Sequence, residues 1–281
     1  MMHIAAPVCA PEEVIQLKQA GADELYCGYL PEQWRNVYGG HDTISRRQGK
    51  ANLGSERALR CTANLANSLH MPIFLALNGR YTALQYPVLL QIAHMWADAG
   101  GTGLILRDVG FMQVIGKHKL PLRLCASLLA LCVNADCVRF FRGLGASRIV
   151  LPRFLSVREM KEITLPFPDM EFEAMVMGDG CPMIDGLCRS LHSENGTEAP
   201  PLCHTVDRGG AIPCAACLVP ALTASGVRYG KLGGRGRPIE ERRAQTAFFS
   251  MAAQGVPENI LQAAFPALFS EPCHCYYGRD E

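Results

Sequence analysis

Seven cysteines in the second half of the chain lie among glycine, proline and polar residues, where packing does not explain them well. They are Cys181, Cys188, Cys203, Cys214, Cys217, Cys273 and Cys275. The six earlier cysteines lie mostly in apolar stretches, where free cysteine packs as a small hydrophobe. Clustered cysteines in a chain of this size indicate metal or redox chemistry more often than disulfides. Four thiolates can hold an iron–sulfur cluster or a structural zinc ion.

The spacing of these cysteines favours a cluster over zinc. The stretch "IPCAACLVPAL" holds Cys214 and Cys217 at the Cys-x2-Cys spacing, from which two sulfur atoms can reach one metal. A zinc ribbon needs two such pairs and the sequence has one, so zinc is the less favoured alternative. A thioredoxin-like redox role for the same two thiols stays open. Cys273 and Cys275 either fold back over the site or lie in a solvated tail.

Polar residues that come just after predicted strands are further candidates. Asn78, Asp108, Ser127 and Arg153 hold such positions. Asp108 is a candidate general base, with a capping or turn role as the alternative. Arg153 is the second candidate catalytic residue, with an ion pair to a nearby acid as the alternative.

Arginines in the polar loops are candidates for binding a carboxylate, because the guanidinium group does this through two parallel hydrogen bonds. The substrate-binding candidates are Arg46, Arg47, Asn78, Ser127 and Arg189. A solvated loop is the alternative for Arg46 and Arg47. The glycine- and arginine-rich stretch "GKLGGRGRP" (230–238) can hold a phosphate, although it matches neither established phosphate-loop motif.

Eight short apolar segments predict the strands that position these residues. They span 3–6, 24–29, 73–77, 103–107, 122–126, 148–151, 171–177 and 228–232. Helical patterns lie between them, and "SVREMKEI" has the capping-box pair Ser156 and Glu159. This alternation predicts a parallel sheet, and eight strands favour an α/β fold of the (β/α)8 TIM-barrel type. A doubly wound open sheet is the competing prediction.

Two long polar insertions interrupt the pattern, at residues 30–56 and 178–217. Both follow strand ends, where barrel enzymes place their active sites, and long loops are often functional. We predict a barrel-like domain over 1–237 that includes the cysteine-rich loop 178–217. Residues 238–281 are predicted to form a helical C-terminal extension with a terminal Cys-x-Cys.

Composition narrows the function classes. The 281 residues carry a net charge of +1 and are 49% hydrophobic, so no polybasic tail for nucleic acid is present. The total charge does not support RNA binding, although a local basic patch can still provide it. No signal peptide is evident, and the longest apolar run of about ten residues is too short to span a bilayer. We therefore expect a cytoplasmic protein.

Three stretches together resemble the peptidase U32 family. They are "GASRIVLPRFLSVREMKEI", "EFEAMVMGDGCPMIDGLCRS" and "PCAACLVPALTASGVRYGKLGGRG", supported near the start by "GADELYCGY", the pair Arg46–Arg47 and "GLILRDVGFM". The similarity covers roughly residues 3 to 237. It implies a barrel-like domain and a [4Fe–4S] cluster, with oxygen-independent hydroxylation of tRNA, rRNA or ubiquinone precursors and prephenate as the hydroxyl donor.

The resemblance also implies a ligand set. The family's four ligand cysteines fall on Cys181, Cys188, Cys203 and Cys214, with Cys217 as a substitute for the last. Three departures remove acid/base groups: Phe154 stands where the family has a carboxylate, Met177-Gly178 replaces its His-Gly, and "KLGGR" replaces "KIEGR". These changes weaken a peptidase assignment.

Three functions follow as hypotheses. The first is an iron–sulfur protein that catalyses or supports oxygen-independent hydroxylation of a small aromatic quinone precursor or an RNA base. The second is a peptidase, although no Cys–His or Ser–His–Asp arrangement is legible. The third is a non-catalytic, cluster-carrying partner subunit. The expected partners are a small-molecule substrate, a carboxylate hydroxyl donor and a second protein in a hetero-oligomer.

Overall fold

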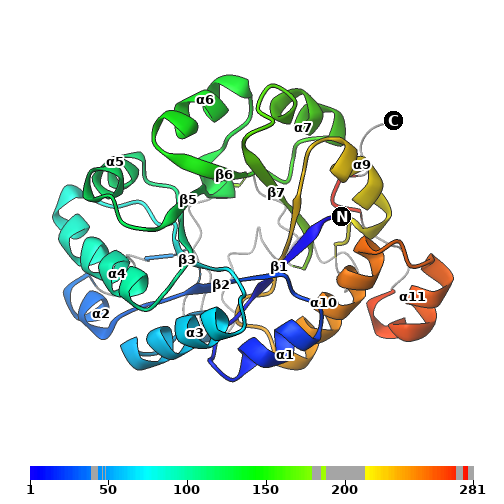
Figure 1. Ribbon diagram of the computed structural model, residues 1–281, viewed down its shortest axis with the longest axis horizontal. Helices are drawn as coiled ribbons and strands as arrows, with labels where there is room; N and C mark the ends of the chain where they lie inside the picture. The colour runs from blue at the N-terminus through cyan, green and yellow to red at the C-terminus, as the bar shows by residue number, and fades with distance from the viewer. Residues whose placement is uncertain are drawn as a thin grey trace.

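Eight parallel strands close into a barrel in chain order (Figure 1). The structure is a computed structural model of residues 1–281, described over 1–38, 44–45, 47, 49–178, 185–187, 213–269 and 275–277. The strands are β1 (His3–Pro7), β2 (Glu24–Gly28), β3 (Ile73–Leu77), β4 (Gly103–Leu106), β5 (Arg123–Ala126), β6 (Ala146–Val150), β7 (Glu171–Met177) and β8 (Tyr229–Leu232). The predicted barrel is confirmed, and the open-sheet alternative is wrong because β8 pairs with β1, with Ala5 opposite Lys231.

Helices surround the barrel on the outside (Figure 1). They are α1 (Glu13–Gln19), α2 (Glu32–Tyr38), α3 (Glu56–Ser68), α4 (Tyr86–Asp98), α5 (Val109–His118), α6 (Ala135–Gly143), α7 (Val157–Thr164), α9 (Val219–Ala224), α10 (Ile239–Ala253) and α11 (Glu258–Ala264). The predicted capping box of α7 is present, since Ser156 and Glu159 exchange hydrogen bonds with each other's backbone N–H groups. None of the described helices is long and apolar enough to cross a membrane.

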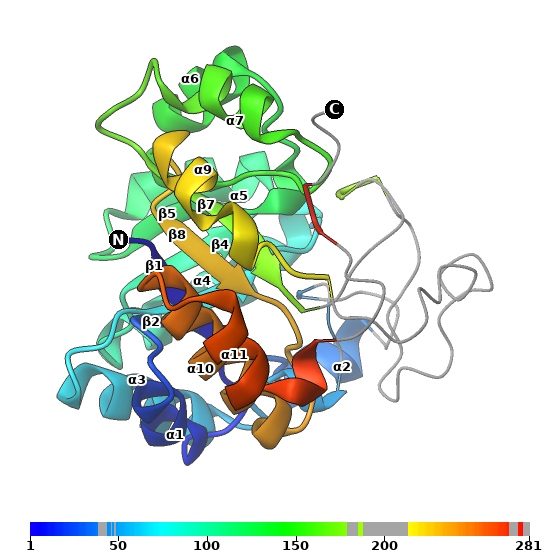
Figure 2. The same ribbon diagram turned by 90° about the vertical axis from the view of Figure 1, so that its right-hand side faces the viewer.

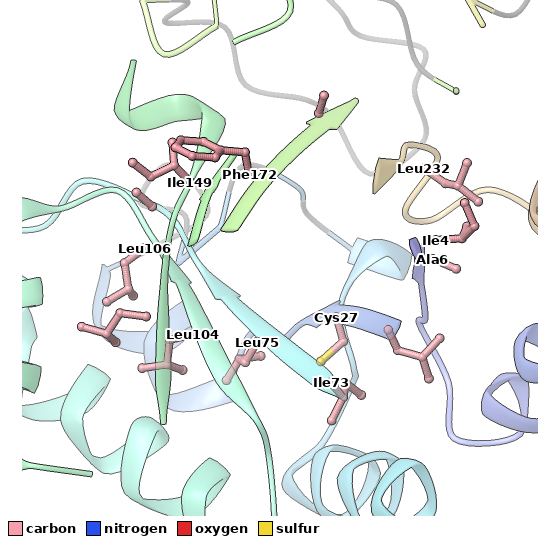
Figure 3. Packing of buried hydrophobic residues seen from close by; sticks show 14 of the residues in the cluster. Ile4, Ala6, Cys27, Ile73, Leu75, Leu104, Leu106, Ile149, Phe172 and Leu232 are labelled. Atoms are coloured by element: carbon pink, nitrogen blue, oxygen red, sulfur yellow. The ribbon is translucent and has the colours of Figure 1, made fainter. Parts of the chain in front are cut away.

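The main apolar core lies between the strands and the helices. Figure 3 shows part of this shell, including Leu75 from β3 and Leu104 from β4. A second, smaller cluster fills the barrel itself and includes Phe74, Ile105 and Val150. The barrel centre is therefore packed, as is usual for this fold, and leaves ligand binding to one of its ends.

The amino-terminal half of the barrel interior holds a buried charge network. Arg148, which is 1% exposed, donates to both oxygens of Glu24 at 2.5 and 2.9 Å and to Glu171 at 2.9 Å. Lys231 lies 2.6 Å from Glu173, next to the same guanidinium group. Burial raises the pKa of Glu173, but Lys231 and Arg148 outweigh that effect and hold the pKa below its usual value. This network closes the end of the barrel opposite the predicted site.

Helix α10 packs against β1 and α1, on the outside of the barrel (Figure 2). Its Arg242 donates to the carboxylate of Glu13 at 2.8 Å and to the backbone carbonyl of Pro7 at 2.9 Å. The predicted boundary at residue 237 therefore falls between β8 and a helix that covers β1. Helix α11 packs against α10 from outside.

Candidate functional site

The carboxyl ends of the strands bring several predicted site residues to one mouth of the barrel. Asn78, Asp108, Ser127 and Arg153 follow β3, β4, β5 and β6 within three residues. Asn78 donates to the Ser127 hydroxyl at 3.2 Å, so these two substrate-binding candidates are in direct contact. Arg46, Arg189, Cys181, Cys188 and Cys203 lie outside the described residues.

Asp108 caps helix α5. One carboxylate oxygen accepts from the Phe111 backbone N–H and the Tyr86 hydroxyl, both at 2.8 Å, and the other accepts from the Tyr81 backbone N–H at 3.1 Å. Burial and the hydrogen bond to Asp108 raise the pKa of Tyr86 to about 12, so this hydroxyl stays a donor. A carboxylate has about four acceptor positions, and the described residues use three of those of Asp108. The capping role is therefore observed, and a general-base role stays a prediction that depends on the remaining position.

Arg153 forms the ion pair that the sequence left open. Its Nε donates to Asp185 at 2.9 Å, its Nη2 contacts the other oxygen of the same carboxylate, and its backbone N–H also donates to that carboxylate. Asp185 is 2% exposed, which makes this a buried, bidentate pair. Any role of Arg153 in catalysis stays a prediction.

The turn at 185–187 is held by further arginines. Arg107 and Arg80 donate to the carbonyl of Gly186, at 2.9 and 3.3 Å. Gly186 has a φ of +83°, and a Cβ there would lie 2.5 Å from the Leu129 carbonyl oxygen, so only glycine fits. This turn lies between Cys181 and Cys188 in the sequence, and three arginine side chains therefore fix the chain between two predicted ligands. The Asp-Gly dipeptide is a turn signal that could have pointed to it.

The cysteine-rich segment leaves and re-enters the described structure at one place. The Gly178 N–H donates to the Pro213 carbonyl at 3.3 Å, and Cys214 forms an antiparallel bridge with Met177 at the end of β7. The Ala216 N–H donates to the Cys214 sulfur at 3.3 Å. Such N–H···S bonds are a common way to stabilise a metal-bound thiolate. Cys214 is therefore fixed at the barrel mouth with its sulfur oriented by the backbone.

The end of the chain folds back onto this point. Cys275 forms a parallel bridge with Cys214, and Figure 2 shows the short 275–277 segment in red. The Tyr277 hydroxyl donates to the Met175 carbonyl at 2.7 Å, which ties the segment to β7. Burial and the nearby Cys275, which hydrogen bonds with it, raise the pKa of Cys217. Of the two alternatives for Cys275, the structure shows the folded-back one.

The described residues alone do not complete a metal site. Within the ranges given above, no group of three or more His, Cys, Asp or Glu side chains is placed to hold a metal ion. The predicted partners of Cys214 all lie in 179–184 and 188–212, outside those ranges. The ligand set therefore stays a prediction, with Cys214 as its described member.

One buried residue at the mouth was predicted only as part of the stretch 230–238. Arg235 follows β8, is 7% exposed, and donates to the Ser45 hydroxyl at 2.9 Å. Ser45 in turn contacts Asn52 at 3.2 Å, and the Asn52 amide donates to the Arg47 carbonyl at 2.9 Å. The stretch "GKLGGRGRP" was the signal, but its pattern did not distinguish Arg235 from the neighbouring arginines.

Parts of two curated proteins are similar in sequence to this chain. The tRNA hydroxylation protein P of Escherichia coli strain K12 is 28% identical over 152 residues, which cover 54% of this chain and 33% of that protein. Its counterpart from Haemophilus influenzae is 32% identical over 91 residues, covering 32% and 20%. The chain spans about a third of the length of these relatives or less.

Solved structures show the fold alone. A structure described as a U32 peptidase aligns with a TM-score of 0.50 at 13% identity, over 92% of this chain and 79% of that chain. N-acetylneuraminate lyase from Fusobacterium nucleatum aligns with a TM-score of 0.53 at 10% identity, over 95% of this chain and 80% of that chain.

The family model for peptidase family U32 matches residues 10–205, which is more than half of the sequence. The chain therefore belongs to peptidase family U32.

Proposed function

We propose that this protein carries a [4Fe–4S] cluster at the carboxyl end of its barrel and hydroxylates an RNA base without molecular oxygen. The observation that carries the proposal is the position of Cys214, which is held at the end of β7 where the cysteine-rich segment returns to the barrel. The relatives named tRNA hydroxylation protein P favour an RNA base over a quinone precursor as the substrate.

The residues at this mouth suit such a cluster. Cys181, Cys188, Cys203 and Cys214 would supply four thiolates, with Cys217 as the nearest substitute for Cys214. An N–H···S bond at Cys214 and the arginine-clamped turn at 185–187 provide the outer contacts that orient ligands of this kind. When bound, the cluster supplies one-electron transfer or, at an iron with a labile position, Lewis-acid activation of a substrate oxygen.

The surrounding side chains would do the positioning. The hydrogen-bonded pair Asn78 and Ser127 offers an amide and a hydroxyl at the mouth. Asp108 keeps one acceptor position, which can hold a substrate proton or hydroxyl group. Arg153 acts through Asp185 on the chain between Cys181 and Cys188, which makes it a positioning residue in this proposal.

Anaerobic analysis of iron and sulfide tests the cluster directly. We expect about four of each per chain in the wild type, as in any protein whose [4Fe–4S] cluster is held by cysteine thiolates, and loss of both in Cys181→Ala and Cys214→Ala. Cys61→Ala is the matched control, because Cys61 is exposed on α3 outside the barrel and should leave the metal content unchanged. A colourless preparation that holds zinc in place of iron would contradict the proposal.

The RNA substrate is tested by mass spectrometry of nucleosides. RNA from cells that lack the gene should lack one hydroxylated nucleoside, and the wild-type gene, but not Cys214→Ala, should restore the extra oxygen. If loss of the gene changed the hydroxylation of quinone precursors alone, the substrate would be a quinone precursor and not an RNA base.

A cluster-carrying partner subunit is the second candidate. The observation that favours it is the use of Asp108 as a helix cap and of Arg153 as an ion-pair partner. In that case the purified chain would bind the cluster and show hydroxylation only when a second protein is added. Hydrolysis of peptides, the activity in the family name, has no supporting contact here: the side chains of His3, His70, His94 and His118 make no hydrogen bond to a serine or cysteine among the described residues.

A further inference from the structure

Two of the three buried arginines in the described structure have a carboxylate partner, and so does the half-buried Arg153. Arg148 binds Glu24, Arg242 binds Glu13, and Arg153 binds Asp185. Arg235 is the exception among the described residues: its one hydrogen bond goes to the neutral Ser45 hydroxyl. A buried cation without a counter-charge is costly, and proteins normally pair such groups.

The unpaired part of Arg235 is a specific atom. Its Nη1 is buried and has no hydrogen-bond partner, while Nη2 is bound to Ser45. The groups that act electrostatically on Arg235 are Tyr26, Cys9, Cys27 and Arg47, and none of these is a carboxylate. Burial lowers the pKa of Arg235, but an arginine keeps its charge at neutral pH. The two N–H groups of Arg235 Nη1 therefore carry positive charge and have no acceptor among the described residues.

A second unpaired atom lies at the same turn. Gln245 on α10 has a buried Oε1 with no partner, and this oxygen is 3.8 Å from the Cβ position of Gly234. These two atoms are the buried side-chain polar atoms without a partner in the described structure, and both flank the turn that follows β8. Buried polar groups normally find partners, so Arg235 Nη1 needs an acceptor and Gln245 Oε1 needs a donor, from ordered water or from a ligand that carries both kinds of group.

The Arg235 guanidinium group lies against Gly28, in space that the side chain of any other residue at position 28 would fill. A Cβ at Gly28 would come within 2.5 Å of Arg235 Nη1 and would also collide with the side-chain oxygen of Asn52. Gly28 is the last residue of β2 and has no positive φ, so a close approach of side chains, rather than backbone conformation, requires glycine here.

We infer that Arg235, supported by Ser45 and Asn52 and lying over Gly28, forms a seat for the terminal oxyanion of a small molecule, either a carboxylate or a phosphate monoester. The free Nη1 supplies charge-assisted hydrogen bonds, which are the strongest that an arginine makes. The low exposure of Arg235, 7%, favours a group at the end of a molecule over a phosphate flanked on both sides by a polynucleotide chain. The assignment of this seat to part of the substrate rests on the proposed function. The binding of a simple anion to the seat can be measured without turnover.

Thermal unfolding of the full-length protein in oxyanion-free buffer tests the seat, with malonate and inorganic phosphate as probes. At a hundredfold excess over the dissociation constant we expect the melting temperature to rise by roughly 5 °C. A rise with malonate alone assigns a carboxylate, and a rise with phosphate alone assigns a phosphate monoester. The measurement is repeated on Cys214→Ala, where the rise should persist even if the cluster proposal fails.

Variants of the seat separate binding from folding. Arg235→Gln should abolish the rise and, without anion, should melt at or above the wild-type temperature, because it removes an uncompensated buried charge. Gly28→Ala should also abolish the rise while keeping the charge, since the added Cβ displaces Nη1. Arg228→Gln is the matched control: this exposed arginine precedes β8 at the opposite end of the barrel, and its variant should keep the full rise.

Two results would overturn the inference. One is the absence of any rise in the wild type with either probe, which would mean that ordered water satisfies both unpaired atoms. The other is an equal rise in the wild type and in both Arg235→Gln and Gly28→Ala.

Discussion

The Asp185 carboxylate gives a quantitative test of how the barrel holds its cysteine-rich segment. Asp185→Ala removes the two carboxylate oxygens that the Arg153 guanidinium group contacts. Breaking a fully buried pair costs about 3–5 kcal/mol. The Arg153 side chain is 15% exposed and can partly turn to water, so we expect a smaller loss, about 2 kcal/mol of unfolding free energy.

The matched control is Asp169→Ala. It makes the same substitution in another Arg–Asp pair, where Arg142 and Asp169 are 51% and 54% exposed. Exposed pairs contribute little, so we expect a loss below about 0.5 kcal/mol. At about 2–4 °C per kcal/mol for a large domain, the melting temperature should fall by about 5 °C for Asp185→Ala and by about 1 °C for the control.

The double variant Arg153→Met/Asp185→Ala completes the cycle. If the two side chains act as one pair, its loss should be smaller than the sum of the single losses by about 1–2 kcal/mol. Equal melting temperatures for Asp185→Ala and Asp169→Ala would refute the view that this turn is anchored by a buried ion pair.

Three further predictions concern the barrel and its thiols. Burial raises the pKa of Glu171, but Arg148 and Arg123 outweigh this effect and lower the pKa. Ionised Glu171 therefore stabilises the fold above its unfolded pKa of about 4.3, and this contribution is lost as the pH falls through the lower pKa of the folded state. In urea unfolding between pH 7 and 3, Glu171→Gln should lose less stability on acidification than the wild type. Gly186→Ala should lower the free energy of unfolding by about 1–3 kcal/mol, because Gly186 has a positive φ and an added Cβ would collide with the Leu129 carbonyl. Gly116→Ala lies in helix α5 with open space around it and should raise this free energy by up to about 1 kcal/mol. Thermal unfolding measures both. Burial raises the pKa of Cys27 and Cys125, so neither thiol should react with a disulfide reagent at pH 8 in the folded protein. The exposed Cys61 should react at once. Reaction of all three thiols at one rate would contradict this prediction.

The barrel was readable from the sequence because its signals are local. Alternation of apolar segments with amphipathic ones placed all eight strands, and the capping box at Ser156 was visible from two residues three positions apart. The position of polar residues after strand ends followed from the topology alone, which is why Asn78 and Ser127 were both expected at one mouth.

The contacts within the site were not readable, because they join residues far apart in the chain. Asp185 is 32 positions from Arg153 and Arg235 is 190 positions from Ser45. For Arg153, the sequence left a catalytic role and an ion pair open, and only the fold shows which acid its side chain contacts. For Arg235 the informative feature is a missing partner, which no local pattern encodes.

The meeting of Gly178 and Pro213 has a consequence for how this protein can change over evolution. Because the chain departs and returns at neighbouring backbone atoms, and the turn at 185–187 is held between them by Arg80, Arg107 and Arg153, the barrel carries this segment between fixed anchor points. The entropic cost of closing a loop between fixed points rises by only about 0.6 kcal/mol when the loop doubles in length. Residues can therefore be added or lost there, and the cysteines respaced, without disturbing the strand register, so new ligand arrangements and new substrates can arise on an unchanged scaffold.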